Sequence, residues 1–233
     1  MSIQVSNLTK LYGQQKAIDN ISFSVGKAEI VGFLGPNGAG KSTTLKIITG
    51  YLQADSGSAV VAGMDVSKDA LGVKAKVGYL PEANPQYYEM YVKEYLGFIA
   101  GVHSIKNVEL KIKNVIEVTG LTLEASKKIG QLSKGYKQRV GIAAALLHDP
   151  EVIILDEPTS GLDPNQIIEI RDVIKNLGKN KTVLFSSHIL QEVEAICDRV
   201  IIINRGHIVA DDKVSNLKER GSLEEVFRTL TNN

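Results

Sequence analysis

A glycine-rich loop between an apolar run and a helix-forming run is the feature that most constrains this chain. The run 29–34 leads into Gly35-Pro36-Asn37-Gly38-Ala39-Gly40, and Lys41-Ser42-Thr43-Thr44 opens the segment that follows. This order predicts a strand, a tight loop and a helix, and the loop matches the phosphate-binding pattern Gly-x-x-x-x-Gly-Lys-Ser/Thr. The alternative, a plain glycine turn before a helix, does not require the full eight-residue pattern.

The residue types of this loop suit a nucleoside triphosphate. Glycines let the backbone curl so that N–H groups point at phosphate oxygens, and the start of a helix adds its positive end. Lys41 would neutralise the β- and γ-phosphates, and Ser42 would offer its hydroxyl to Mg²⁺. The residues expected to contact the nucleotide are Gly35, Pro36, Asn37, Gly38, Ala39, Gly40, Lys41, Ser42 and Thr43.

Short apolar runs predict a mostly parallel core sheet. Residues 152–155, 183–185 and 200–203 are continuous apolar runs, as in strands that are buried on both faces. Between the first two runs, an apolar stripe at helical spacing follows Pro164, a residue that suits the first turn of a helix. Strands that alternate with helices in this way predict an α/β fold.

Two other segments have a different pattern. Ile21, Phe23 and Val25 alternate with polar residues, which predicts a half-buried strand and an antiparallel N-terminal sheet. Residues of about 90–148 show no alternation, and their apolar residues recur at helical spacing. We therefore expect a single domain over residues 1–233, with an N-terminal antiparallel β subdomain and a helical subdomain inserted at about 90–148.

Three polar residues follow predicted buried strands. Asp156 and Glu157 come directly after the run 152–155, and His188 follows the predicted strand 182–187. The carboxyl ends of parallel strands form the ligand edge of an open α/β sheet. We expect Asp156 to hold Mg²⁺, Glu157 to polarise an attacking water and His188 to contact the γ-phosphate, the alternatives being a solvated acidic turn and a histidine without a role. The remaining histidines are expected at the surface or at helix caps: His103, His148 and His207.

A polar stretch at 132–139 forms another candidate anion site. Ser133 and Gly135 precede a helix predicted at 138–147, and the start of a helix favours bound anions. Taken alone, a simple helix cap explains Ser133 equally well. Ser133 precedes Asp156 by 23 residues, and this position beside the other elements favours the anion site.

Composition excludes several classes of protein. Lys plus Arg total 27 and Asp plus Glu total 26, and the net charge of +1 gives no whole-chain footprint for nucleic acid. The one cysteine, Cys197, excludes an intrachain disulfide and suits a reducing compartment. The longest apolar run, 142–147, is far shorter than the roughly 20 residues of a spanning helix. We therefore expect a soluble chain, and the first twelve residues lack the pattern of a secretory signal.

Together these motifs resemble the nucleotide-binding subunit of an ABC transporter, over residues 3–230. Residues 35–42 look like the Walker A loop of that family, and 152–157 look like its Walker B strand. Between them, 132–138 look like the signature loop, and 160–163, Ser-Gly-Leu-Asp, look like the D-loop. This order of motifs implies an α/β P-loop NTPase of the ABC type that binds ATP and Mg²⁺.

Two single residues extend the resemblance. His188 falls at the switch histidine of the family, and Tyr12 falls at the aromatic residue that stacks on adenine. In the detailed sequence of its motifs, the chain is most similar to the ABC-2 exporter branch. Within that branch, residues 133–136 and 147–150 look most like the ATPase linked to bacterial gliding motility.

The chain departs from the family pattern at two places. In the signature, usually Leu-Ser-Gly-Gly-Gln, Lys134 replaces a glycine and Tyr136 replaces the glutamine, while the serine and the second glycine remain. After the predicted strand 77–80, the glutamine of the family is replaced by Glu82, which also offers an oxygen to Mg²⁺. Gln86 lies four residues further on and is the alternative ligand.

The resemblance also implies partners. The signature of one subunit would cover the ATP of its neighbour, so Ser133 and Gly135 would bind nucleotide in trans, in a head-to-tail dimer with a second copy or a paralogue. A polytopic membrane permease subunit would carry the substrate and hold the chain at the cytoplasmic face of the cell membrane. Tyr87, Tyr88 and Tyr91 are expected to line a groove for a helix of that subunit, unless these rings pack inside the helical insertion.

ABC-type ATPases that act on nucleic acid or on the ribosome are the alternative. The nucleic-acid branch inserts a long coiled coil, and residues 44–130 show no sustained heptads. Ribosome-acting relatives usually carry two cassettes, and each motif occurs once here. The sequence therefore favours a transporter ATPase with no nucleic-acid partner.

Overall fold

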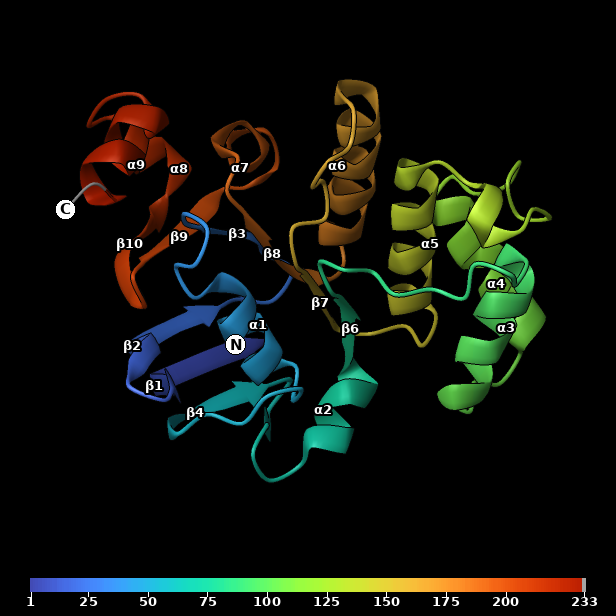
Figure 1. The fold of residues 1–233 in the computed structure, drawn as a ribbon, viewed down its shortest axis with the longest axis horizontal. Coiled ribbons are helices and arrows are strands. Elements are labelled where there is room, and N and C mark those ends of the chain that lie inside the picture. The colour runs from blue at the N-terminus through green and yellow to red at the C-terminus, as the bar shows by residue number, and fades with distance from the viewer. Residues whose placement is uncertain (232–233) are drawn as a thin grey trace.

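A six-stranded sheet forms the centre of the computed structural model, which describes residues 1–231 (Figure 1). Its strand order is β10-β9-β3-β8-β7-β6, and every neighbouring pair is parallel except β9 with β10. The predicted, mostly parallel core sheet is therefore confirmed. Its strands are β3 (Ile30–Leu34), β6 (Val77–Leu80), β7 (Val152–Leu155), β8 (Thr182–Ser187), β9 (Arg199–Asn204) and β10 (His207–Lys213).

The central strands of this sheet are buried on both faces, so alternate side chains enter two different cores. In β7, Val152 and Ile154 pack toward the N-terminal sheet, whereas Ile153 and Leu155 pack under the helices of the opposite face. All four side chains are fully buried. This two-residue period explains why the strand reads as one continuous apolar run.

The N-terminal sheet is antiparallel, as predicted, with the order β2-β1-β4-β5. In the register of β1, Val5 lies opposite Phe23 of β2 and Ala59 of β4. The first helix of the chain packs into the core of this sheet through Leu45 and Ile48. The elements here are β1 (Ile3–Tyr12), β2 (Gln15–Val25), α1 (Lys41–Ile48), β4 (Ser56–Val61), β5 (Met64–Asp65) and α2 (Ala70–Lys76).

Helices cover the opposite face of the central sheet. The long helix α6 begins at Pro164, as predicted, after Asp163, whose side chain accepts a hydrogen bond from the N–H of Gln166 at 3.0 Å. Its stripe is buried against the sheet through Ile170 and Ile174. The helices of this layer are α6 (Pro164–Gly178), α7 (Leu190–Ile196), α8 (Val214–Lys218) and α9 (Leu223–Thr231).

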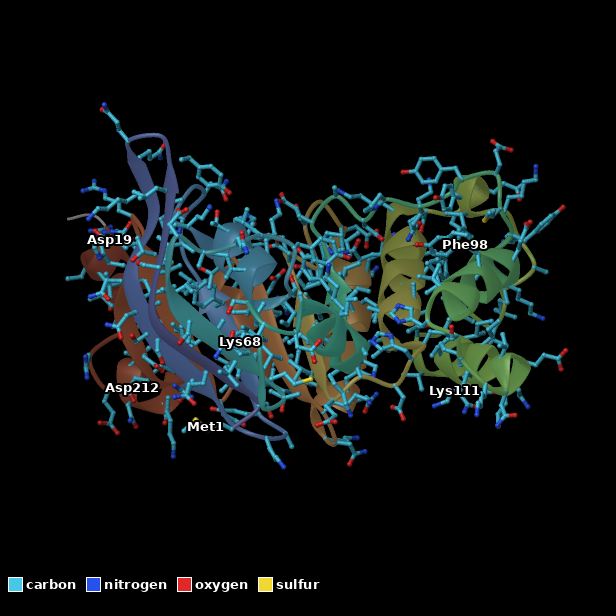
Figure 2. The ribbon with its side chains drawn as sticks, turned by 90° about the horizontal axis from the view of Figure 1, so that it is seen from below. Met1, Asp19, Lys68, Phe98, Lys111 and Asp212 are labelled. Carbon is cyan, nitrogen blue, oxygen red and sulfur yellow. The ribbon has the colours of Figure 1, made fainter. Side chains whose placement is uncertain are left out.

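Residues 92–146 form a separate group of helices at one end of the molecule's long axis (Figure 1). Figure 2 shows Phe98 and Lys111 at this end and Asp19 and Asp212 at the other. The group consists of α3 (Val92–Val102), α4 (Val108–Val118), a 3-10 turn η1 (Ile129–Gln131) and α5 (Lys134–Leu146).

The start of α5 differs from the prediction. The helix begins at Lys134 rather than at Gln138, because the Ser133 hydroxyl caps it and accepts a hydrogen bond from the N–H of Tyr136 at 3.3 Å. Gly135 thus lies in the first turn of the helix, where a Cβ would come within 2.6 Å of the Gln166 side chain. The glycine marks a close helix contact here and does not mark the end of a loop.

These elements confirm the α/β fold with an antiparallel N-terminal sheet, a mostly parallel core sheet and a helical segment between β6 and β7. Within residues 1–231, no helix has both the length and the apolar character needed to cross a membrane.

Candidate active site

The loops after β3, β7 and β8 meet at one edge of the central sheet, because these neighbouring strands are parallel. Gly35, after β3, donates its N–H to the carbonyl oxygen of Ser187 at the end of β8, at 3.4 Å. At this edge lies a cleft of about 360 Å³, which we call the loop cleft. It is lined by Gln15, Ala17, Asn37, Gly38, Gly40, Lys41, Ser42, Thr43, Glu82 and Glu157.

Three of the predicted nucleotide contacts form the base of the glycine loop and do not line this cleft. Ala39 is buried, and Gly35 lies so close to β9 that a Cβ would come within 2.3 Å of the Ile203 carbonyl oxygen. The carbonyl oxygens of Gly35 and Pro36 instead accept hydrogen bonds from Lys41 Nζ, at 2.7 and 3.3 Å.

Two other glycines of the loop adopt left-handed backbone conformations. The φ angles of Gly38 and Gly40 are 78° and 110°, values that side chains rarely tolerate. A Cβ on Gly40 would also lie 2.5 Å from the Ala17 carbonyl oxygen. The loop therefore requires glycine at both positions to turn the chain into α1, which begins at Lys41 and points its positive end at the cleft.

Lys41 connects the glycine loop to the acidic end of β7. Its side chain is only 5% exposed, and Nζ lies 3.2 Å from Oε1 of Glu157, in addition to its two carbonyl partners. A buried ammonium needs oxygen partners of this kind, because burial without them is costly. Phosphate oxygens in the loop cleft would offer this ammonium charge-assisted hydrogen bonds.

Ser42 and Asp156 form a pair of hard oxygen donors beside the cleft. The Ser42 hydroxyl donates to Oδ1 of Asp156 at 3.0 Å, and the Ser186 hydroxyl donates to the same oxygen at 2.6 Å. Asp156 is 1% exposed, and these two bonds hold its buried carboxylate in place. Sequence reasoning missed Ser186, although its place two residues before His188 on the predicted strand could have indicated it.

This donor set fits a magnesium ion. Mg²⁺ prefers hard oxygens and is usually held by one or two carboxylates together with substrate phosphates and water. Ser42, Asp156 and Glu82 offer such oxygens at the cleft. In the described part of the chain, no three His, Cys, Asp or Glu side chains converge as a ready metal cage, so the ion would depend on a nucleotide for its remaining ligands.

Glu157 combines an unusual backbone with two close side-chain partners, an ammonium and an imidazole. Its φ angle is 49°, a left-handed value that is uncommon outside glycine, and its N–H donates to the Ser186 hydroxyl at 2.9 Å. Its Oε2 lies 2.8 Å from Nδ1 of His188, while Oε1 faces Lys41. The carboxylate therefore lines the cleft between an ammonium and an imidazole.

The structure separates the two candidates that follow β6. Glu82 lines the loop cleft. Gln86 is turned toward the helical segment, where its Nε2 donates to the Lys137 carbonyl oxygen at 2.7 Å and to Asn84 Oδ1 at 3.0 Å. Of the two, only Glu82 lines the cleft together with Ser42 and Lys41.

Tyr12 lies at the end of β1 and is 53% exposed, so it is not a buried residue of the sheet. The ammonium of Lys10 lies 5.9 Å from the centre of this ring. Tyr12 does not line the loop cleft, whereas the following strand contributes Gln15 and Ala17 to it. Sequence reasoning missed these two residues, because neither carries a motif.

Ser133 and Gly135 do not line the loop cleft of their own chain. Instead, the start of α5 packs on the segment between β7 and α6: Gly135 contacts Gln166, and the Lys134 ammonium lies beside Gly161. The signature stretch and the D-loop stretch are thus neighbours in one subunit. Ser133 can therefore contact a nucleotide only when another chain binds that nucleotide or when the subunit undergoes a large movement.

The remaining histidines only partly match the prediction. His103 caps the end of α3 and His207 is exposed, as expected. His148, by contrast, is partly buried, stacks on His103 with ring centres 4.2 Å apart, and has Nε2 3.1 Å from the Val77 carbonyl oxygen. Burial, and to a smaller degree the neighbouring His103 ring, lowers the pKa of His148 to about 4.

Comparisons with known proteins agree with this geometry. The family model described as "ABC transporter" matches residues 18–160. The bacitracin transport ATP-binding protein BcrA of Bacillus licheniformis is 41% identical over 94% of this chain and 72% of its own length. The linearmycin resistance ATP-binding protein LnrL of Bacillus subtilis (strain 168) is 39% identical over 94% of this chain and 71% of its own length.

A solved structure shows the same fold over nearly the whole chain. The ATP-binding subunit of an ABC transporter superposes with a TM-score of 0.88 and 28% identity, covering 99% of both chains. The family match extends over the glycine loop, the signature stretch and the acidic end of β7, which are the elements that build and flank the loop cleft. This chain therefore belongs to the ABC transporter family, as one of its ATP-binding and ATP-hydrolysing subunits.

Proposed function

We propose that this chain powers export through a separate membrane permease by an ATP-driven cycle of dimer closure and opening. One observation carries the proposal: hydrogen bonds and ion pairs connect the end of the glycine loop to the ends of β7 and β8. Lys41 pairs with Glu157, which is bonded to His188, and Ser42 is bonded to Asp156. Lys41, Ser42 and Glu157 line the loop cleft, and Asp156 and His188 lie behind them. These are the groups that positioning and hydrolysis of a triphosphate require. Residues 1–233 would act as one ATPase domain with the helical subdomain inserted at about 90–148.

Each residue has a specific role in this proposal. The N–H groups of the glycine loop and Lys41 bind the phosphates, and the ammonium exchanges its carbonyl partners for phosphate oxygens. Ser42, Asp156 and Glu82 would hold Mg²⁺, which supplies charge neutralisation on the phosphate oxygens when bound. Glu157 orients and polarises the attacking water, and His188, exposed on one side, contacts the γ-phosphate.

A head-to-tail dimer follows from the position of the signature stretch. Ser133 and Gly135 lie outside the loop cleft of their own chain, so a second copy or a paralogue would have to present them to the nucleotide. The exposed ring of Tyr12 would stack on the base. ATP would then be bound between two chains, and its hydrolysis would release the contact.

A second, larger cleft suits the permease. This cleft of about 590 Å³, which we call the lateral groove, runs between α2, the loop after β6 and the helices α3 and α5. Apolar and aromatic side chains line most of it, among them Tyr51, Leu71, Tyr79, Tyr95 and Ile99. Interfaces favour such rings, because tyrosine buries apolar area while its hydroxyl stays bonded.

The polar atoms of the lateral groove support a protein occupant. The Tyr79 hydroxyl and Nδ1 of His148 are buried and find no hydrogen-bond partner among residues 1–231. Burial raises the pKa of Tyr79, so its hydroxyl remains a donor. Lys74 adds a cation over the Tyr51 ring, at 4.7 Å. A helix of the permease would satisfy the two buried atoms if the groove opened on binding, and it would meet the Lys74 ammonium directly.

The tyrosines predicted to line a groove lie beside this cleft. Tyr87, Tyr88 and Tyr91 are about half exposed, and none of them lines the lateral groove. Tyr87 packs on Tyr95, whose ring lines the groove, with ring centres 6.3 Å apart. We propose that the three rings extend the docking surface at its border, while Tyr95, 7% exposed, belongs to the helical core.

The cargo follows only from the relatives. Two of them are named for bacitracin transport and linearmycin resistance, and we infer from these names that the cargo is a toxic compound moved outward. The resemblance of residues 133–136 and 147–150 to the gliding-motility ATPase is the finer alternative. An ATPase that acts on nucleic acid or the ribosome is the other alternative, which the net charge of +1 does not favour.

Co-purification with a candidate polytopic membrane subunit tests the proposal. Leu71→Asp replaces an apolar contact in the lateral groove by a charge and should reduce co-purification at least about tenfold, since burying a charge against an apolar partner is costly. Leu123→Asp is the matched control, because both leucines are at least 80% exposed but Leu123 is outside the groove. Both variants should retain the stability of the parent within about 0.5 kcal/mol. Equal co-purification of the two variants would contradict the groove assignment.

A further inference from the structure

A buried carboxylate outside the loop cleft has no cation beside it. Glu192 of α7 is 1% exposed, and in the structure of residues 1–231 it takes part in no ion pair. Both of its oxygens are used by hydroxyl groups: Oε1 accepts from Thr159 Oγ1, and Oε2 accepts from Ser187 Oγ at 2.6 Å. A carboxylate in such a place is costly, so its two hydrogen bonds are essential to its burial.

The two hydroxyls belong to the two loops that carry the hydrolytic pair. Thr159 follows Glu157 by two residues, on the loop after β7, and is 3% exposed. Ser187 directly precedes His188 at the end of β8 and is fully buried. The hydrogen bonds of Glu192 to Thr159 and to Ser187 therefore connect the loop after β7 to the end of β8. The bond between Glu157 and His188 joins the same two segments.

We propose that Glu192 is a positioning residue for ATP hydrolysis, which holds the Glu157 loop and the His188 loop at a fixed separation. It touches neither the nucleotide site nor the reacting atoms, since it does not line the loop cleft. The proposal rests on the proposed roles of Glu157 and His188 in the chemistry.

The backbone of Glu157 explains why such a clamp is needed. Its φ of 49° is a strained value that persists only where the surroundings hold it in place. On one side, its N–H is tied to Ser186 of β8 at 2.9 Å. On the other side, the bond of Thr159 to Glu192 holds the chain as it leaves the strained turn. Loss of that second tie lets the turn relax and moves the carboxylate away from the water it must orient.

The hydrogen bonds, more than the charge, carry this role. In Glu192→Gln the amide oxygen accepts from Thr159 and the amide N–H donates to Ser187. The Ser187 hydroxyl can then turn to the Ile189 carbonyl oxygen, which lies 3.5 Å away. The glutamine variant should therefore retain at least about a third of the parent's kcat, whereas Glu192→Ala should lose the clamp entirely.

Substitutions at position 159 test the proposal. Thr159→Val keeps the shape and removes the hydroxyl, and it should lower kcat about 10- to 100-fold, the cost of misplacing a reacting group by roughly 1 Å. Its Kd for ATP, measured by fluorescence titration, should stay within about twofold, because Lys41 and the glycine loop are untouched. Thr159→Ser restores a hydroxyl and should restore most of kcat. Glu194→Gln, an exposed change on the same helix, is the control and should match the parent.

Several outcomes would overturn the clamp. Wild-type kcat in Thr159→Val with only a lower melting temperature would reduce Glu192 to a structural residue. An equal loss of kcat and ATP affinity would point to general damage of the site. Should Glu192→Ala fail to fold, Thr159→Val and Ser187→Ala carry the test alone, since each removes one hydroxyl. Glu157→Gln run in parallel keeps the two questions apart: if it hydrolyses ATP normally, the proposed function fails whatever Glu192 does.

Discussion

At the scale of single residues, several residues of the candidate site have left-handed backbone conformations. Glu157 has a φ of 49°, and Gly38 and Gly40 of the glycine loop have φ values of 78° and 110°. Glu157 and both of these glycines line the loop cleft. Lys41 joins the two halves, since its ammonium contacts both the loop carbonyls and Glu157.

Lys41→Ala should remove most ATP binding. The change deletes a buried cation directed at the phosphates, and each charge-assisted hydrogen bond contributes about 1.5–3 kcal/mol. Lys46→Ala, an exposed change five residues along the same helix, is the control and should bind as the parent does. Nucleotide titration by fluorescence measures both. Equal affinities in two folded variants would contradict the assignment of the loop.

Tyr12→Ala should weaken ATP and GTP to a similar degree. A ring that stacks on the base makes little use of hydrogen-bond readout, and base–aromatic stacking contributes about 1–3 kcal/mol. The melting temperature should be nearly unchanged, because the ring is 53% exposed. Competition titrations with the two nucleotides check this. A variant that melts lower but binds both nucleotides normally would show that Tyr12 is a structural residue.

At the scale of elements, two histidines join the ends of two helices to the central sheet. His103 ends α3, His148 follows α5, and the second ring is bonded to the carbonyl of Val77 in β6. The contact is built from a neutral ring, because burial and the neighbouring ring lower the pKa of His148 to about 4. Acid should therefore loosen the helical segment before it affects the sheet.

This contact makes stability depend on pH in a defined window. An unfolded histidine has a pKa of about 6.5, so between that value and about 4 the unfolded chain binds more protons than the folded chain. Stability is lost as the pH falls through this window, by about 1–2 kcal/mol once the partial exposure of the ring is allowed for. His148→Gln should remove that part of the dependence. Denaturant unfolding at pH 7 and pH 4.5 measures it, and parallel losses in parent and variant would contradict the argument.

The sequence predicted the elements better than their contacts. Continuous apolar runs were sufficient to place β7, β8 and β9, because strands buried on both faces need no alternation. The start of α5 was missed, since Gly135 reads as a loop residue until its close contact with Gln166 is known. The burial of Glu192 could not be predicted either. Thr159 lies 33 residues from it in sequence, and Ser187, although only five residues away, belongs to no motif. Long-range hydrogen bonds leave no local pattern.

At the scale of the whole molecule, the loop cleft of one subunit lacks the residues that the proposed cycle takes from a second chain. The loop cleft contains the glycine loop and Glu157 but neither Ser133 nor Gly135 of the signature stretch. The loop after β6 borders both clefts, since Pro81 lines the lateral groove and the next residue, Glu82, lines the loop cleft. A nucleotide in one cleft and a permease helix in the other would thus contact the same short loop.

The mass of the Glu157→Gln variant in solution, with ATP and with ADP, tests the central claim most directly. The variant keeps Ser42 and Asp156 for the metal and loses the group that polarises water, so hydrolysis should fall about 10²–10⁴-fold while ATP stays bound. Trapped ATP should shift the variant to a dimer on size-exclusion chromatography with light scattering, and ADP should leave it monomeric. A variant that remains monomeric with ATP and hydrolyses it at the parent's rate would contradict both the role of Glu157 and the ATP-driven dimer.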